Sequence, residues 1–260
     1  MNNVLALAGI VIKEMYRRKD FYVLFVMTAL ISLVLGSVRF FNDEQIVRFL
    51  KDICLHLIWL STLVIAITTS ARQIPAERES RTIFPLLAKP VSRWELIAGK
   101  FFGCWLACGI ALFVFYSFFA LLSASHEHTW PHLVFYQALW LHWVLLAVVV
   151  GMGLLGSVVL AAPSSTTTIS FIAVLGILFA GGHLNGVAAN MRGISAGLVY
   201  GVYYCIPHLE WYHDARELAI HGWGGIPWLY VAGATLYGAL YTGFLLGLTW
   251  LLFRRKTLML

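Results

Sequence analysis

Six apolar runs, separated by polar or charged residues, dominate the pattern along the chain. They cover residues 21–38, 53–70, 96–122, 135–160, 169–184 and 226–253. Most are close to or above the roughly 20 residues that an α-helix needs to cross the hydrocarbon core of a bilayer. The pattern therefore predicts an all-α integral membrane protein with six transmembrane helices.

The composition supports this class and excludes others. Hydrophobic residues make up 60% of the 260 residues and charged residues 12%, and the mean hydropathy is +0.82. Six spans leave no room for a soluble catalytic domain, so residues 1–260 are predicted to form one transmembrane domain. We assign the net charge of +6 to membrane orientation and not to nucleic acid. The four cysteines have no zinc or disulfide spacing.

Basic residues are distributed unevenly between the two sides of these helices. If both termini and the segment after the second span share one side, thirteen Lys and Arg lie on that side and five on the other. The five are Arg39, Arg48, Lys51, Arg192 and Arg216. Cytoplasmic loops carry the excess of Lys and Arg, so both termini are predicted to be cytoplasmic.

Residues 1–20 are predicted to form a helix that lies on the membrane surface. Apolar residues recur there at helical spacing, and basic residues gather towards the end. The apolar set is Val4, Leu7, Ala8, Val11 and Met15. The sequence does not resemble a cleaved signal peptide. A plain cytoplasmic extension of the first span remains the alternative.

The polar stretch 76–100 is the most highly charged interruption. Together with Arg72 it holds six of the eighteen Lys and Arg. Thr82 can cap a short helix, Pro90 disfavours helix at the preceding residue, and Ser92 with Glu95 forms a capping box that opens the third span. The short helix would expose an apolar face made of Ile83, Leu86 and Leu87. Such a face fits docking of a soluble partner, and an ordinary loop is the open alternative.

Small residues predict where helices pack closely. Gly99 and Gly103 have small-xxx-small spacing in the third span, and Ala239, Gly243 and Gly247 share a face of the last span. Residues 151, 153 and 156 in the fourth span are also glycine. Lys100 is expected to extend its ammonium group to the membrane interface.

Residues 190–225 are too interrupted to span, but their interleaved aromatic and polar side chains suit the headgroup level. We expect an outer re-entrant segment there. The same segment offers a second hypothesis, a membrane-embedded metal-dependent enzyme, or a permease that handles metal or haem through outer histidines. Its candidate residues are His208, Glu210, His213 and Asp214. The spacing does not fit the HExxH arrangement.

Two further groups have weaker metal-binding patterns. Cys104 and Cys108 share a helix face without a third ligand nearby, so packing is the preferred reading. A short polar loop at 123–132 contains His126, Glu127, His128 and His132. We interpret it as a solvated loop.

The polar stretch resembles that of the permease subunits of exporter-like (type-two) ABC transporters. The order of elements is similar along the whole chain, and the specific likeness covers about 25 residues. It rests on Glu77, Glu79, Thr82, Leu86, Leu87, Lys89, Pro90, Val91, Ser92, Arg93, Gly99 and Lys100. Arg81 departs from the pattern, because many members have glycine there.

The resemblance implies specific roles. Residues 76–95 would be a cytoplasmic coupling loop that docks on a separate ATPase, residues 1–20 a surface helix and residues 190–225 outer re-entrant helices. The docking residues would be Glu77, Glu79, Arg81, Thr82, Ile83, Leu86, Leu87 and Lys89.

The resemblance also implies partners and a location. ATP and Mg²⁺ would bind to the ATPase, since this chain lacks the GxxxxGK[ST] phosphate loop and needs no cofactor of its own. Two permease copies, as a homodimer, would work with two ATPase subunits. The protein would lie in the bacterial plasma (inner) membrane, in contact with lipid. The sequence does not identify the substrate.

Overall fold

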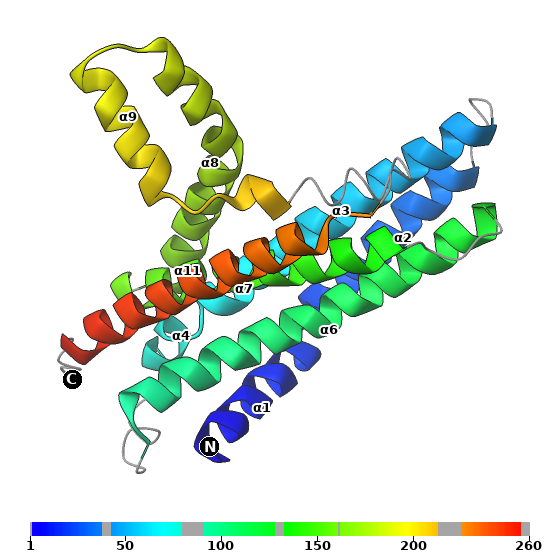
Figure 1. The fold of residues 1–260 in the computed structure, drawn as a ribbon. Coiled ribbons are helices and arrows are strands. Elements are labelled where there is room, and N and C mark those ends of the chain that lie inside the picture. The colour runs from blue at the N-terminus through cyan, green and yellow to red at the C-terminus, as the bar shows by residue number, and fades with distance from the viewer. Residues whose placement is uncertain are drawn as a thin grey trace.

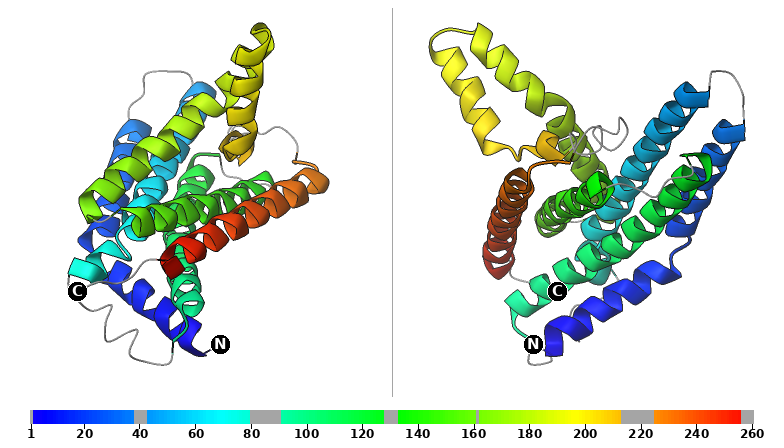
Figure 2. Two further views of the ribbon diagram at one scale, coloured as in Figure 1. Left: turned by 90° about the vertical axis from the view of Figure 1, so that its left-hand side faces the viewer. Right: turned by 45° about the vertical axis from the view of Figure 1, so that its right-hand side comes forward.

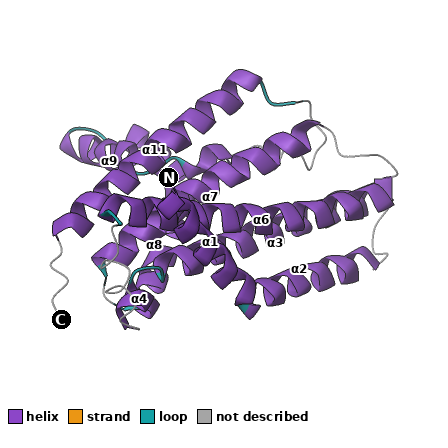
Figure 3. Cartoon of the chain, turned by 90° about the horizontal axis from the view of Figure 1, so that it is seen from below, coloured by secondary structure: helices purple, strands orange, loops and turns teal. Residues whose placement is uncertain are grey.

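A computed structural model describes residues 2–37, 43–79, 91–127, 133–160, 162–212 and 225–255, and this described part contains helices and no strand (Figure 3). The elements are α1 (Asn2–Arg17), α2 (Lys19–Ser37), α3 (Asp43–Ala71), α4 (Pro75–Glu79), α6 (Arg93–Glu127), α7 (Leu133–Val159), α8 (Pro163–Asn190), α9 (Ile194–Cys205), the 3₁₀ helix η1 (Leu209–Tyr212) and α11 (Trp228–Arg255). The all-α prediction is therefore confirmed.

Within the described residues, five helices are long and apolar enough to cross a membrane, namely α3, α6, α7, α8 and α11. The first predicted span falls on α2, whose apolar part, Phe21–Val34, is shorter. The six-span count therefore stays a prediction. Helix α1, α4, the start of α6 and the end of α11 lie at one end of the bundle (Figure 1).

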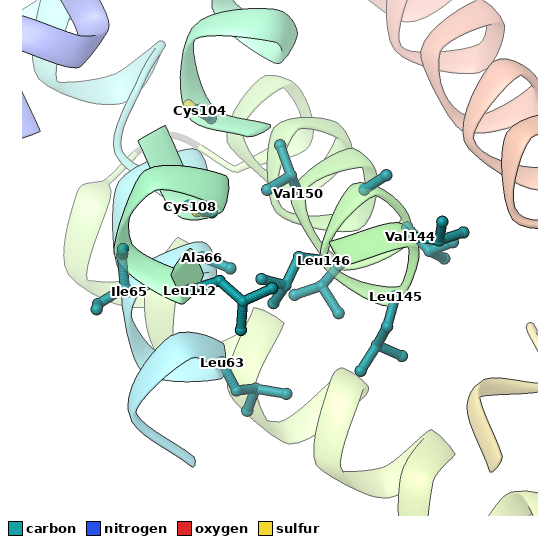
Figure 4. Close-up of a cluster of buried hydrophobic side chains, with 14 of the residues drawn as sticks. Leu63, Ile65, Ala66, Cys104, Cys108, Leu112, Val144, Leu145, Leu146 and Val150 are labelled. Atoms are coloured by element: carbon teal, nitrogen blue, oxygen red, sulfur yellow. The ribbon is translucent and has the colours of Figure 1, made fainter. Parts of the chain in front are cut away.

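The core lies where α3, α6 and α7 meet (Figure 4). Helix α7 is buried along most of its length, and Leu141, Leu146 and Val150 are fully enclosed. Cys104 and Cys108 project into this core from α6, and both are free thiols, which agrees with the packing role predicted for them. Apolar side chains gain little from leaving lipid, so dense packing is what holds such a core together.

Small residues bring some of these helices into close contact, as predicted. A Cβ atom added at Gly103 would lie 2.7 Å from Cβ of Val11, and one at Gly99 would lie 2.7 Å from Cβ of Leu7. Helix α1 therefore packs closely against both glycines, and it does so through its predicted apolar face. Gly153 on α7 meets Ser70 on α3 in the same way.

The prediction that Ala239, Gly243 and Gly247 pack against another helix is wrong within this chain. Ala239 and Gly243 are exposed, and a Cβ atom at Gly243 or Gly247 would meet nothing within 4 Å. Helix α11 packs mainly against α7 and buries a different set of residues. They are Val231, Ala234, Thr242, Leu245, Leu246, Thr249 and Phe253, together with Gly238.

Several helices extend beyond the predicted spans. Helix α3 begins at Asp43 rather than at residue 53, and α6 runs from Arg93 to Glu127, so part of the predicted loop 123–132 is helical. The residues between the fourth and fifth predicted spans are largely helical as well, because α8 already begins at Pro163. Pro163 suits a first helical position, and the hydroxyl groups of Thr166 and Thr167 donate to carbonyl groups four residues back. The glycines near residue 181 do not end α8, which continues to Asn190.

Helices α8 and α9 form an arm that diverges from the other helices (Figures 1 and 2). Helix α9 returns beside α8 and buries none of its residues. The chain then reaches the middle of α11, where the Tyr241 hydroxyl donates to the Cys205 carbonyl at 2.7 Å. From there η1 leads back along α11, and the Tyr212 hydroxyl donates to the Ala234 carbonyl at 2.8 Å.

Candidate functional site

The predicted docking segment 76–95 is described at its two ends. Glu77 and Glu79 belong to α4, and residues 91–95 lead into α6. The remaining predicted docking residues lie outside the described residues, so the structure tests neither the short helix nor its apolar face. These residues are Arg81, Thr82, Ile83, Leu86, Leu87 and Lys89.

The entry to the segment is a tight connection from α3 to α4. The Gln73 backbone N–H donates to the Ser70 carbonyl at 3.3 Å, and Ile74 and Pro75 are buried. Pro75 is the first residue of α4, where its missing N–H is no loss. The buried side chain of Gln73 donates to the Thr69 carbonyl at 3.1 Å. The entry is therefore fixed to the end of α3.

Lys100 joins this entry to α6. Its ammonium group donates to the Gln73 side-chain oxygen at 3.0 Å and forms an ion pair with Glu77. The Lys100 side chain is only 6% exposed, so the expectation that it extends to the membrane interface is wrong. An ammonium group needs a partner when it is buried, and the carboxylate of Glu77 provides one within reach.

The exit from the segment is the predicted capping box. The Ser92 backbone N–H donates to the Glu95 carboxylate at 2.8 Å, and the Glu95 backbone N–H donates to the Ser92 hydroxyl at 3.2 Å. Two N–H groups at the start of α6 are satisfied in this reciprocal way. The capping box therefore fixes the start of α6 directly after Ser92.

Arg93 links the exit to the end of α11. Its Nη1 donates to the carbonyl groups of Phe253 at 2.9 Å and Arg254 at 2.8 Å. The guanidinium group lies over the Phe253 ring at 5.7 Å. A cation at a helix C-terminus satisfies the last carbonyl groups and the helix dipole. The sequence showed Arg93 as one of several loop cations, but gave no signal for this partner.

The two ends together hold the segment on three long helices. The entry is attached to α3 and, through Lys100, to α6, and the exit is attached to α6 and, through Arg93, to α11. A force applied to residues between these ends would reach all three helices. The arrangement suits mechanical coupling.

The outer candidate cluster is only partly described. His208 Nδ1 lies 3.1 Å from Glu210 Oε1, and the His208 backbone N–H donates to the Tyr237 hydroxyl at 3.0 Å. The His208 ring stacks on Trp211. His213 and Asp214 lie outside the described residues. In the part of the chain that the structure describes, no three His, Cys, Asp or Glu residues are placed to hold a metal ion.

A buried polar contact inside the bundle was missed from the sequence. His142 on α7 lies 3.0 Å from the Thr62 hydroxyl on α3 and 3.3 Å from the Tyr116 hydroxyl on α6. These contacts join three helices in the apolar core. The available signal was a lone histidine within an apolar run, which does not reveal its partners.

A comparison with models of protein families identifies the family of this chain. The sequence model of one family, described as ABC-2 family transporter protein, matches residues 48–258. The matched range begins within α3 and includes both ends of the docking segment. No curated protein matches the chain.

Proposed function

Because the chain belongs to the ABC-2 family of transporter proteins, we propose that it is the transmembrane permease subunit that a separate ATPase drives to move a substrate across the membrane. ATP and Mg²⁺ bind to the ATPase, and this chain binds neither. The docking surface is the apolar face of the coupling segment, made of Ile83, Leu86 and Leu87.

The observation that supports this proposal is the attachment of the coupling segment at both ends. Lys100 holds the entry and Arg93 holds the exit, and neither contact is a simple surface contact between neighbours in sequence. A loop without a mechanical role does not need such anchors. The anchors would pass a movement of the docked ATPase to α3, α6 and α11.

The proposed architecture places the other parts of the chain relative to the membrane. Helix α2 is the first of six spans, α1 lies at the cytoplasmic surface, and both termini are cytoplasmic. Residues 190–225 re-enter the outer leaflet. Two observations support this path: α9 is an apolar helix of 12 residues, and the chain after it contacts Tyr241 halfway along α11.

The proposed assembly contains two copies of this permease and two ATPase subunits in the bacterial plasma membrane. The exposed small-residue face of α11 leaves space for a neighbouring helix. The second hypothesis, a metal-dependent enzyme or metal-handling permease at His208 and Glu210, has no observation in its favour. The pair lacks a third ligand among the described residues.

The docking proposal is tested by replacing Leu86 and Leu87 with Asp. Each Asp would place a charge in a contact that excludes water, which is costly without a partner. We expect the double variant to insert into the membrane and to bind the ATPase at least ten-fold more weakly. The measurement is a pull-down of the ATPase by tagged permease from detergent extract.

The matched control is Leu133→Asp. Leu133 is half exposed and begins α7 at the opposite end of the bundle from the docking segment. This variant should bind the ATPase like the wild type. Unchanged ATPase binding by the Leu86 and Leu87 variant would reject the docking surface, and residues 80–90 would then be an ordinary loop.

A further inference from the structure

A cavity of about 420 Å³ lies between α7, α8 and α11, on the side where α8 leaves the bundle. Leu155 on α7, Ala173 and Ile177 on α8 and Leu245 on α11 line its walls. The connection after α9, residues 205–207, lines a further part of it. The cavity is thus formed by elements that are distant in sequence.

The lining is almost entirely apolar. Among the described residues that form it, none is charged, and the principal polar side-chain groups are the hydroxyls of Ser170 and Tyr241. The Tyr241 hydroxyl already donates to the Cys205 carbonyl. Water would find few partners in such a cavity, and an empty cavity would lose dispersion contacts on every wall. The lining therefore favours an apolar occupant.

The surroundings identify this occupant as hydrocarbon. Helices α7, α8 and α11 are three of the span-capable helices, so lipid tails are the solvent around the cavity. Its volume is that of a small-molecule site, which is roughly 300–1,000 Å³.

We propose that the cavity binds one acyl chain of a membrane phospholipid, and that the bound chain supports the arm formed by α8 and α9. Helix α9 buries none of its own residues, and the part of α8 that follows the cavity is also largely exposed. The acyl chain fills the space between α8 and the bundle. It supplies contacts that side chains do not make.

The test compares two alanines on α8. Both side chains are exposed within the chain, but Ala173 lines the cavity and Ala180 lies outside it. Wild type, Ala173→Phe and Ala180→Phe are reconstituted in vesicles of palmitoyl-oleoyl-phosphatidylglycerol and phosphatidylcholine, extracted in mild detergent and analysed by native mass spectrometry. We expect wild type and Ala180→Phe to retain one phospholipid, and Ala173→Phe to retain it at least five-fold less.

A second measurement separates a specific site from general lipid contact. Complete removal of lipid should lower the unfolding temperature of wild type and Ala180→Phe more than that of Ala173→Phe, whose phenyl ring fills the space. If Ala173→Phe does not fold, Ile177→Phe takes its place. Equal phospholipid retention by wild type and the cavity variant, or retention of a free fatty acid in place of phospholipid, would overturn the proposal.

Discussion

Lys100 is the residue on which the candidate site depends most clearly. Its ammonium group is buried beside Gln73 and Glu77, so it connects the entry of the coupling segment to α6. A charge in such a place has lost its hydration and relies on its ion pair. The contact joins residues 23 and 27 positions apart, and sequence reasoning placed the same ammonium group at the membrane interface.

Replacing Lys100 with Met should destabilise the protein. The Glu77 carboxylate would lose its ion pair with Lys100 in a partly buried place, at a cost of about 3 kcal/mol. Thermal unfolding in detergent measures this as a lower midpoint. Adding Glu77→Gln to Lys100→Met removes the charge that was left, and should recover most of the loss. If Lys100→Met alone is as stable as the wild type, the ion pair does not stabilise the protein.

At the level of elements, sequence patterns predicted contacts between neighbouring helices better than they predicted helix ends. Gly99 and Gly103 of α6 were predicted to allow close packing, because glycine lacks a side chain. Helix α1 does pack closely against both of them. The start of α8 was missed because polar residues such as Thr166 and Thr167 bond within the helix and continue it. The small-residue face of α11 was assigned a contact that this chain does not make.

Gly103→Ala should loosen α1. The new methyl group would meet Cβ of Val11 at 2.7 Å and the backbone of Ala8 at 3.0 Å, and backbone cannot move aside cheaply. Overpacking of this kind costs about 1–3 kcal/mol. Limited proteolysis should cut the variant within α1 faster than the wild type. Gly9→Ala is the control, since a Cβ atom there meets nothing within 4 Å. Equal cutting of Gly103→Ala and Gly9→Ala would contradict the packing.

At the level of the whole molecule, periodicity and composition predicted the class, and the family followed from one short charged stretch. The contacts that organise the candidate site could not be predicted in the same way. Arg93 bonds to carbonyl groups about 160 residues away, and backbone carbonyl groups leave no mark in a sequence. The path after α9 was expected as a re-entrant segment, but its contacts with the middle of α11 are made by the hydroxyl groups of Tyr237 and Tyr241, which the sequence does not single out.

The proposed topology predicts which positions can be labelled from each side. In a variant without native cysteines, a membrane-impermeant maleimide added outside intact cells should react at Ser125→Cys and Ala215→Cys. It should not react at Ser80→Cys or Thr257→Cys, because the excess of Lys and Arg keeps those positions in the cytoplasm. Labelling of residue 80 from outside would invert the topology and remove the coupling segment from the ATPase.

Site-directed crosslinking tests most directly whether residues 76–95 hold an ATPase. Leu86→Cys is introduced into the permease without native cysteines, and membranes that also contain the ATPase are treated with a short heterobifunctional reagent, whose maleimide reacts with the introduced thiol and whose succinimidyl ester reacts with lysine amines within its reach. The account predicts a crosslinked product that contains both chains, and no such product from Ser125→Cys at the other end of the bundle. A product from residue 125 and none from residue 86 would contradict it.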